Sequence, residues 1–296
     1  MPLKLGTQDV TLKLGSQDVT AYLGAEIVSL HPEAVAWRDA VVDNGGSVSG
    51  ATLAAVSDFC TAIDAAGLRD RFHRLNLFCG DSDASLVAVR TPLYRGPSAS
   101  GTQYGNAIDT NVNFVAGDYS ESAGLTGNTS TGKFLETGIL ANFSTDRHIS
   151  VHCQAFAGLF RRLIGVAGDF LITSNATAGA LSAISTTGTS ARNIGTVDSN
   201  AGIQFTAGDI ATLADGAPSA TFYRNGTVRN AGNDTNTGPS TSTVEMVVFG
   251  QGNATGPDLG TDSRLAGYSI GYDMTASQVA SYAAICQSFH QSLGRS

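Results

Sequence analysis

The sequence of 296 residues is poor in charge, because Asp, Glu, Lys and Arg together make up only 14% of it. Typical soluble domains contain about a quarter of charged residues. The net charge at pH 7 is −8, and no basic cluster is longer than Arg161-Arg162. Nucleic-acid binding through a basic patch is therefore not expected. No apolar run approaches the length of a membrane-spanning helix, so we expect no membrane insertion.

Cysteine is scarce and scattered. The four residues Cys60, Cys79, Cys153 and Cys286 form no C-x-x-C pair and show no metal-ligand spacing. We expect free, buried thiols. The sequence leaves open whether Cys60 and Cys79 form a disulfide bridge. The start of the chain lacks the continuous apolar stretch of a secretory signal peptide, which predicts a protein made in a cytosol.

Catalytic motifs are also missing. The sequence has no G-x-S-x-G for a nucleophilic serine. Gly127 to Lys133 spells G-x-x-x-x-G-K, but Phe134 replaces the Ser or Thr of a phosphate loop, which favours a turn between strands. A glycosidase needs two carboxylates roughly 5–10 Å apart, and Glu136 and Glu245 each stand alone on their predicted strands. We predict a protein without catalytic activity or cofactor. The sequence leaves open the alternative of a catalytic pair in which two different strands each contribute one carboxylate.

His148, Ser150 and His152 alternate along one predicted strand and therefore share one face. Zinc could use two such histidines, but no third ligand lies at a motif spacing. We expect this face to be solvated or to lie between subunits, and we predict no metal site.

Glycine is abundant, with 35 residues, and Ser, Thr, Asn and Ala are frequent beside it. This composition suits an extended β-protein with many turns. From about Leu93 to Tyr272, short alternating runs are separated by polar turns, which indicates a two-sheet sandwich or jelly roll. The strand candidates are residues 112–115, 134–137, 148–156, 170–172, 221–223, 244–249 and 268–270.

Two helices are predicted before this region. Pro32 suits a first helical turn, and Asn44-Gly45-Gly46 ends the helix that it begins. Ser49 caps a second helix with one apolar stripe, and Trp37 on the first helix is expected in the core. Residues 75–78 are expected to form a short strand and residues 90–100 a linker. The stripe consists of Leu53, Val56, Cys60 and Ile63.

A last helix is predicted at the C-terminal end. Thr275 and Gln278 form a capping box, in which each side chain binds the other residue's backbone N–H. Gly294 fits the end of the helix. Its buried stripe is predicted to be Val279, Tyr282, Cys286 and Phe289.

The first 29 residues hold a nine-residue repeat. Residues 3–11 and 12–20 are nearly identical, and residues 21–29 form a decayed third copy. The first two copies have Leu-x-Leu, a Gly-led turn and then Val, the pattern of a short strand with a turn behind it. So small a unit cannot bury its own apolar face, which predicts partner chains; a disordered leader is the alternative. The residues expected to attach the chain to its assembly are Leu5, Gly6, Val10, Leu14, Gly15, Val19 and Leu23.

Three segments resemble the concanavalin A-like (laminin-G-like) jelly roll. Residues 124–138 are similar to that family's Gly/Asn-rich turn before an early strand, and residues 264–278 to its last strand and helical exit. Residues 220–228 resemble its hairpin, in which Asn225-Gly226 suits a type I′ turn. The resemblance implies a mainly β protein. Short β-repeats in residues 1–30 and a two-helix section in 31–92 would precede a jelly-roll sandwich with a C-terminal helix in 93–296.

The whole layout resembles bacteriophage-type virion proteins: short Leu-Gly repeats, a helical pair, a jelly roll and a terminal helix. That resemblance implies a fibre, spike or decoration component of a phage or gene-transfer-agent particle, made in the host cytoplasm. Its expected partners are its own copies, other virion proteins and host-surface polysaccharide. We expect a trimer, since three chains can bury a thin β-repeat.

The glycan-binding role implied by this resemblance directs attention to polar and aromatic loop residues. Aromatic faces stack on sugars and amides bind hydroxyls. The candidates are Tyr104, Tyr223, Asn225, Asp234 and Asp258, and the loop aspartates offer weak support for a hard cation. The alternatives are a structural decoration protein without ligand, a polysaccharide depolymerase, and a cellular lectin or adhesin.

Overall fold

The computed structural model describes short stretches at the N-terminus and most of the rest of the chain. It divides the chain into two units, Met1–Leu30 and His31–Ser296. Among the described residues, no helix is both long and apolar enough to cross a membrane. The described residues are 3–5, 8–10, 12–14, 17–19, 30–81, 85–96, 104–141, 146–155, 162–167, 170–174, 181–187, 190–197, 207–216, 219–231 and 243–295.

Each of the first two nine-residue copies forms one antiparallel hairpin. β1 (Leu3–Leu5) pairs with β2 (Gln8–Val10), and β3 (Leu12–Leu14) pairs with β4 (Gln17–Val19). The predicted Leu-x-Leu strands are confirmed, and the Gln-x-Val part of each copy forms a return strand that we did not predict. Nearly the same sequence gives the same register, with the first Leu of each copy opposite its Val. Gly6, Gly15 and Leu23 lie outside the described residues.

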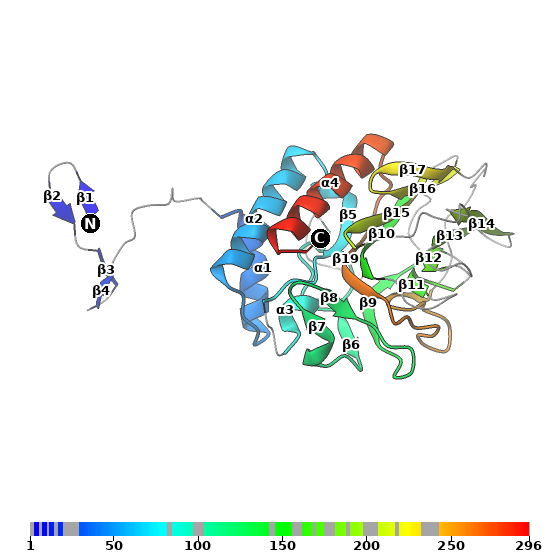
Figure 1. The fold of residues 1–296 in the computed structure, drawn as a ribbon, viewed down its shortest axis with the longest axis horizontal. Helices are drawn as coiled ribbons and strands as arrows, with labels where there is room; N and C mark the ends of the chain where they lie inside the picture. Colours follow the sequence, from blue (N-terminus) through cyan, green and yellow to red (C-terminus); the bar gives the residue numbers. More distant parts are fainter. Residues whose placement is uncertain are drawn as a thin grey trace. The chain divides into compact units, whose positions relative to one another are not determined.

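The second unit contains two antiparallel sheets. The first sheet has the order β17-β16-β15-β10-β19-β8-β7, and β5 also pairs with β19. The second has the order β14-β13-β12-β11-β18-β9-β6. The predicted fold class, a mainly β sandwich with a C-terminal helix, is confirmed (Figure 1).

The strands of the first sheet are β5 (Phe72–Asn76), β7 (Tyr119–Ser120), β8 (Gly124–Thr126), β10 (Arg147–Ala155), β15 (Asp209–Gly216), β16 (Ser219–Arg224), β17 (Thr227–Ala231) and β19 (Arg264–Gly271). Those of the second are β6 (Thr110–Val112), β9 (Phe134–Leu140), β11 (Arg162–Gly165), β12 (Phe170–Ser174), β13 (Leu181–Thr187), β14 (Ser190–Val197) and β18 (Glu245–Val248).

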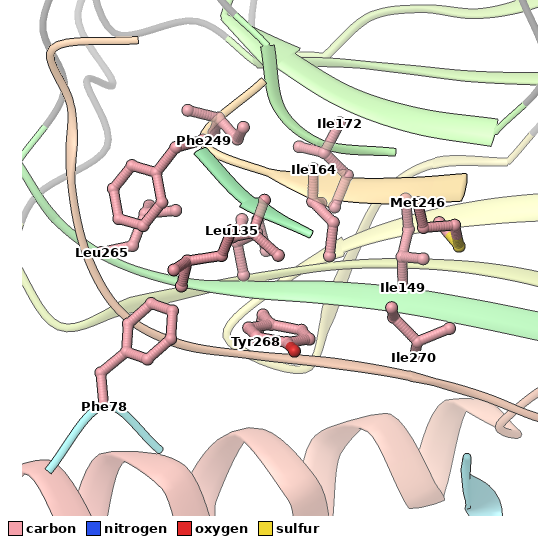
Figure 2. Close-up of a cluster of buried hydrophobic side chains, with 14 of the residues drawn as sticks. Phe78, Leu135, Ile149, Ile164, Ile172, Met246, Phe249, Leu265, Tyr268 and Ile270 are labelled. Atoms are coloured by element: carbon pink, nitrogen blue, oxygen red, sulfur yellow. The ribbon is translucent and has the colours of Figure 1, made fainter. Parts of the chain in front are cut away.

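The hydrophobic core fills the space between the two sheets. Ile149 of β10 and Ile270 of β19 point toward Ile164 of β11 and Met246 of β18, and all four side chains are buried (Figure 2). Successive residues of a strand point to opposite faces. The alternate residues of β10 therefore leave the core and face the helices.

The predicted helices are confirmed as α1 (Pro32–Asp43), α2 (Gly50–Ala65) and α4 (Ala276–Ser292). Ser49 caps α2, and Thr275 with Gln278 forms the expected capping box of α4. α4 packs on β15 and β17 at the outer face of the first sheet, and α2 packs on both α4 and α1 (Figure 1). Trp37 is buried and donates a hydrogen bond from Nε1 to the carbonyl of Thr91, 3.0 Å away. All four cysteines are free and buried.

The region between α2 and the sandwich differs from prediction. The strand expected at residues 75–78 begins earlier, at Phe72, and pairs with β19. The one-turn helix α3 (Val87–Arg90), which we did not predict, ends at the first residue of the expected linker, and Tyr94 within the linker forms an isolated bridge with Leu75. The polar residues His73 and Arg74 made this strand resemble a loop in the sequence.

Candidate functional site

A polar pocket of about 300 Å³ lies between the beginning of β15, the β16–β17 turn and the C-terminal half of α4. It contains one of the residues that we predicted for sugar binding, Asn225. Its walls combine amide, carboxylate and guanidinium groups. The lining residues are Ala207, Gly208, Asp209, Asn225, Gln287, His290, Gln291 and Arg295.

The β16–β17 turn forms one wall of this pocket. Asn225 and Gly226 both have positive φ, 51° and 75°, as a type I′ hairpin requires. A Cβ added to Gly226 would lie 2.5 Å from Cα of Ala280 on α4. The missing side chain therefore lets the turn approach the helix closely.

Side-chain bonds tie the turn to β15. Oδ1 of Asn225 accepts from the N–H of Ile210 at 2.8 Å, and its Nδ2 donates to Oδ1 of Asp209 at 2.5 Å. Arg224 donates from Nη2 to Oδ2 of Asp209 at 2.7 Å. Both oxygens of this carboxylate are thus held, and its charge is balanced by a buried guanidinium.

The opposite wall is built by α4. Gln287 and Gln291 lie one helical turn apart on the same face, the first half-buried and the second exposed. Neither side-chain amide forms a hydrogen bond within the described part of the chain. Two amide groups therefore remain available to a ligand in the pocket.

Buried histidines and an arginine lie on the sheet side of α4. Nε2 of His290 lies 3.1 Å from Nδ1 of His152 on β10, and Nη1 of Arg295 lies 3.4 Å from Nδ1 of His290. Burial lowers the pKa of His152 to about 3, and burial with the neighbouring His152 and Arg295 lowers the pKa of His290 well below its ordinary value. Both rings are neutral at pH 7, so the pocket suits hydrogen bonding better than proton transfer.

The expectation of a solvated or inter-subunit histidine face on β10 is wrong. His148, Ser150 and His152 are all fully buried within the chain, beneath helix α4 and strand β5. Nδ1 of His148 lies 2.6 Å from the carbonyl of Tyr272, and its Nε2 lies 2.9 Å from Oγ of Ser269. Alternation alone could not distinguish a face covered by a helix from a face in water.

The structure does not gather the four described sugar-binding candidates, Tyr104, Tyr223, Asn225 and Asp258, in one pocket. Tyr104 and Tyr223 are only 6% and 5% exposed, so neither offers a ring face to a ligand. Asp258 lies in a different loop, where its backbone pairs with Gln251 at 3.0–3.1 Å. Asn225 alone lines the pocket, and Asp234 lies outside the described residues. Role assignments for these residues stay predictions.

Sequence reasoning missed the other polar residues of the pocket. Gln287 and Gln291 occupy the positions of α4 that lie between its buried residues, where glutamine usually indicates a solvated face. Asp209 opens a strand that we did not predict. Only the packing of α4 on β15 brings these side chains together.

Two glutamates lie on neighbouring strands of the second sheet. Glu136 lies on β9 and Glu245 on β18, which pair with each other. Burial raises the pKa of Glu245, and the charge of Glu136 acts in the same direction. The N–H of Gly138 donates to the Glu245 carboxylate, which gives this group a structural role at a distortion of β9.

Comparison with known proteins gives no family assignment. No family model matches the chain, and no curated protein matches it. Similar solved structures include the binding domain of botulinum neurotoxin serotype D, with 8% identity over 52% of this chain and a TM-score of 0.40. The matched part spans only 40% of that structure's chain.

Two further structures are an arabinanase domain and a sialidase. Domain 4 of an extracellular arabinanase from Geobacillus stearothermophilus, in complex with arabinotriose, matches 60% of this chain and 82% of its own, with 12% identity and a TM-score of 0.39. A Trypanosoma rangeli sialidase matches 78% of this chain and 39% of its own, with 9% identity and a TM-score of 0.43. At these scores the likenesses carry no argument about function.

Proposed function

We propose that this protein is a non-enzymatic virion component of the fibre, spike or decoration type. Its jelly roll binds a host-surface glycan in the pocket beneath α4, and residues 1–29 attach it to the particle. The observation that carries the glycan part is the pair of amides Gln287 and Gln291, which form no hydrogen bond among the described residues and line a pocket of about 300 Å³ together with Asn225 and Asp209. The virion part rests on the resemblance of the sequence layout.

The chemistry of the pocket favours a hydroxyl-rich, neutral ligand. Each amide offers two donors and an acceptor, which match sugar hydroxyls. The carboxylate of Asp209 is neutralised by Arg224, so a charged ligand gains little there. A pocket of this volume suits a single sugar or the end of a chain. Among the described residues its lining includes no Phe, Tyr or Trp ring for stacking, and we therefore expect weak binding per site, strengthened by several copies acting together.

The hairpins of the first unit support the attachment role. An isolated two-stranded hairpin is at best marginally stable in water, and each of these has strands of three residues. Pairing with other chains would bury their Leu and Val side chains. We propose a homotrimer joined to other virion proteins through this segment.

Glycan-array binding by the full chain tests the pocket. The double variant Gln287→Ala/Gln291→Ala should lose about tenfold or more in affinity, because two neutral hydrogen bonds to the sugar disappear. Ser281→Ala changes an exposed residue of the same helix outside the pocket, and it should bind normally. Unchanged binding by the double variant would show that the glycan binds elsewhere.

Two alternative functions have distinct outcomes. A decoration protein without ligand would bind no glycan on the array while joining particles normally. A depolymerase is favoured by one observation, the raised pKa of Glu245 beside Glu136. It would release reducing sugar from host capsule, and Glu245→Gln would abolish that release.

A further inference from the structure

Three side chains with metal-binding atoms meet where the start of α1 packs on the middle of α2. His31 offers an imidazole nitrogen, Glu33 a carboxylate oxygen and Cys60 a thiol sulfur, and these atoms lie within 4.8 Å of one another. His31 and Glu33 are half-buried, whereas Cys60 is fully buried. The cluster is thus closed on the protein side and open toward water. We propose that it binds one Zn²⁺ ion through nitrogen, oxygen and sulfur, a ligand set that suits zinc.

The imidazole of His31 is oriented as in many metal-binding histidines. Its Nε2 lies 3.0 Å from Oδ2 of Asp64, and its Nδ1 accepts from the N–H of Glu33 at 3.2 Å. A neutral ring that accepts at Nδ1 carries its proton on Nε2, which therefore donates to Asp64. Metal-bound histidines commonly donate their other N–H to a carboxylate. A metal at Nδ1 would replace the hydrogen bond by which His31 caps α1.

The carboxylate of Glu33 has one oxygen available. Its Oε1 forms an ion pair with Arg69, whereas its Oε2 is buried and has no hydrogen-bond partner among the described residues. Arg69 is held in place by a hydrogen bond to the carbonyl of Gly96 and by the ring of Tyr94, 4.0 Å from the guanidinium carbon. Oε2 can bind a cation without breaking the ion pair.

Tyr94 provides an independent sign that a ligand belongs here. Its side chain is fully buried, and its hydroxyl lies beside the Cys60 thiol, a weak hydrogen-bond partner, with no other partner among the described residues. A buried hydroxyl with only a weak partner costs free energy. A metal-bound thiolate is a stronger acceptor than a thiol, and the Tyr94 O–H can then donate to it.

The charges of the cluster balance once the metal is present. Cys60 is fully buried, which favours its neutral, protonated thiol in the absence of metal. Zinc binds the thiolate and releases that proton. Glu33, Asp64 and the thiolate then carry three negative charges, and Arg69 with Zn²⁺ carries three positive ones. Ca²⁺ and Mg²⁺ prefer oxygen ligands alone, and we expect neither to compete.

Metal titration of the full chain, after dialysis against a chelator, tests the proposal. We expect one Zn²⁺ per chain and release of about one proton. Co²⁺ should give a thiolate-to-metal charge-transfer band in the near ultraviolet, which Zn²⁺ abolishes and Ca²⁺ does not.

Matched variants assign the binding to this cluster. Cys60→Ser should remove the charge-transfer band, and Cys79→Ser, at another buried cysteine, should keep it. Asp64→Asn should weaken binding by about 10–100-fold, because the imidazole loses its orienting carboxylate. Circular dichroism checks that each variant is folded. Failure of the wild-type chain to bind Zn²⁺, or a band retained in folded Cys60→Ser, would overturn the proposal.

Discussion

Nδ1 of His152 on β10 lies 3.1 Å from Nε2 of His290 on α4, so the two rings join the first sheet to the helix that covers it. Nε2 of His152 also lies 2.9 Å from the hydroxyl of Tyr282. The hydrogen bonds of these buried rings are made within the protein. A proton added to either ring would have to be accommodated without water and near Arg295, which already lowers the pKa of both.

This arrangement predicts that the protein loses stability in mild acid. Burial lowers the pKa of His148 to about 4 and of His152 to about 3, and His290 also lies well below its ordinary value. Below pH ~6.5 these histidines bind protons in the unfolded chain but remain neutral in the folded chain. Their contribution to stability is therefore complete above that pH and is lost as the pH falls toward 4. From pH 7 to 5 His148 and His152 should each cost about 2 kcal/mol, and His290 should act in the same direction. Urea unfolding at both pH values measures the loss.

Glu245 and Asp273, whose pKa values are raised by burial, oppose this trend, and a variant of His290 isolates the contribution of that histidine. Burial raises the pKa of Asp273 to about 6, so its folded form binds a proton more tightly and gains stability in the same range. His290→Gln should remove about one histidine's share of the pH dependence. An equal dependence in wild type and His290→Gln would contradict the prediction for this residue.

A buried ion pair predicts a large effect of a single substitution. Arg74 and Asp109 are both fully buried and lie 2.6 Å apart, and Tyr268 donates to the same carboxylate at 2.7 Å. Asp109→Ala leaves the guanidinium without its counter-charge and should cost about 3–5 kcal/mol of unfolding free energy.

The double variant Arg74→Met/Asp109→Leu is the matched control for the ion pair. It removes both charges and should cost much less than Asp109→Ala alone. Urea unfolding of the two variants decides the matter. Equal losses of unfolding free energy would mean that the change in side-chain shape, rather than the unpaired charge of Arg74, causes the destabilisation.

The close approach of the β16–β17 turn to α4 predicts the effect of a single methyl group. Gly226 has φ 75°, and a Cβ there would meet Cα of Ala280 at 2.5 Å. Gly226→Ala combines backbone strain of about 1–2 kcal/mol with displacement of the helix. Gly45 also has positive φ, 83°, but has open space around it, so Gly45→Ala should show the strain alone. The midpoint of thermal unfolding should be lower for Gly226→Ala than for Gly45→Ala. Only Gly226→Ala should lose glycan binding.

Short-range signals explain the parts of the fold that the sequence predicts well. The caps at Ser49 and Thr275 and the turn at Asn225-Gly226 depend on residues within four positions of one another, and all three are confirmed. Helix stripes and the two-residue alternation of strands are equally local, and they indicate the sandwich without giving its strand order.

Long-range pairing explains what the sequence does not reveal. β15 begins at Asp209 and contains Asp215, which makes it look like a loop. Each aspartate is buried because an arginine from a neighbouring strand binds it, Arg224 at 2.7 Å and Arg147 at 3.1 Å. The proposed zinc ligands escape detection for the same reason. His31 and Cys60 lie on different segments, and only the packing of α1 on α2 joins them.

Deletion of residues 1–29 separates attachment from folding. The chain divides at residue 30, and residues 31–296 contain the whole hydrophobic core between the sheets. The truncated chain should therefore unfold in urea at the same midpoint as the full chain. It should lose self-association and incorporation into particles, because the hairpins that need partners are gone. Light scattering and particle reconstitution measure these losses. A truncated chain that still assembles would place the attachment in the helical section that follows.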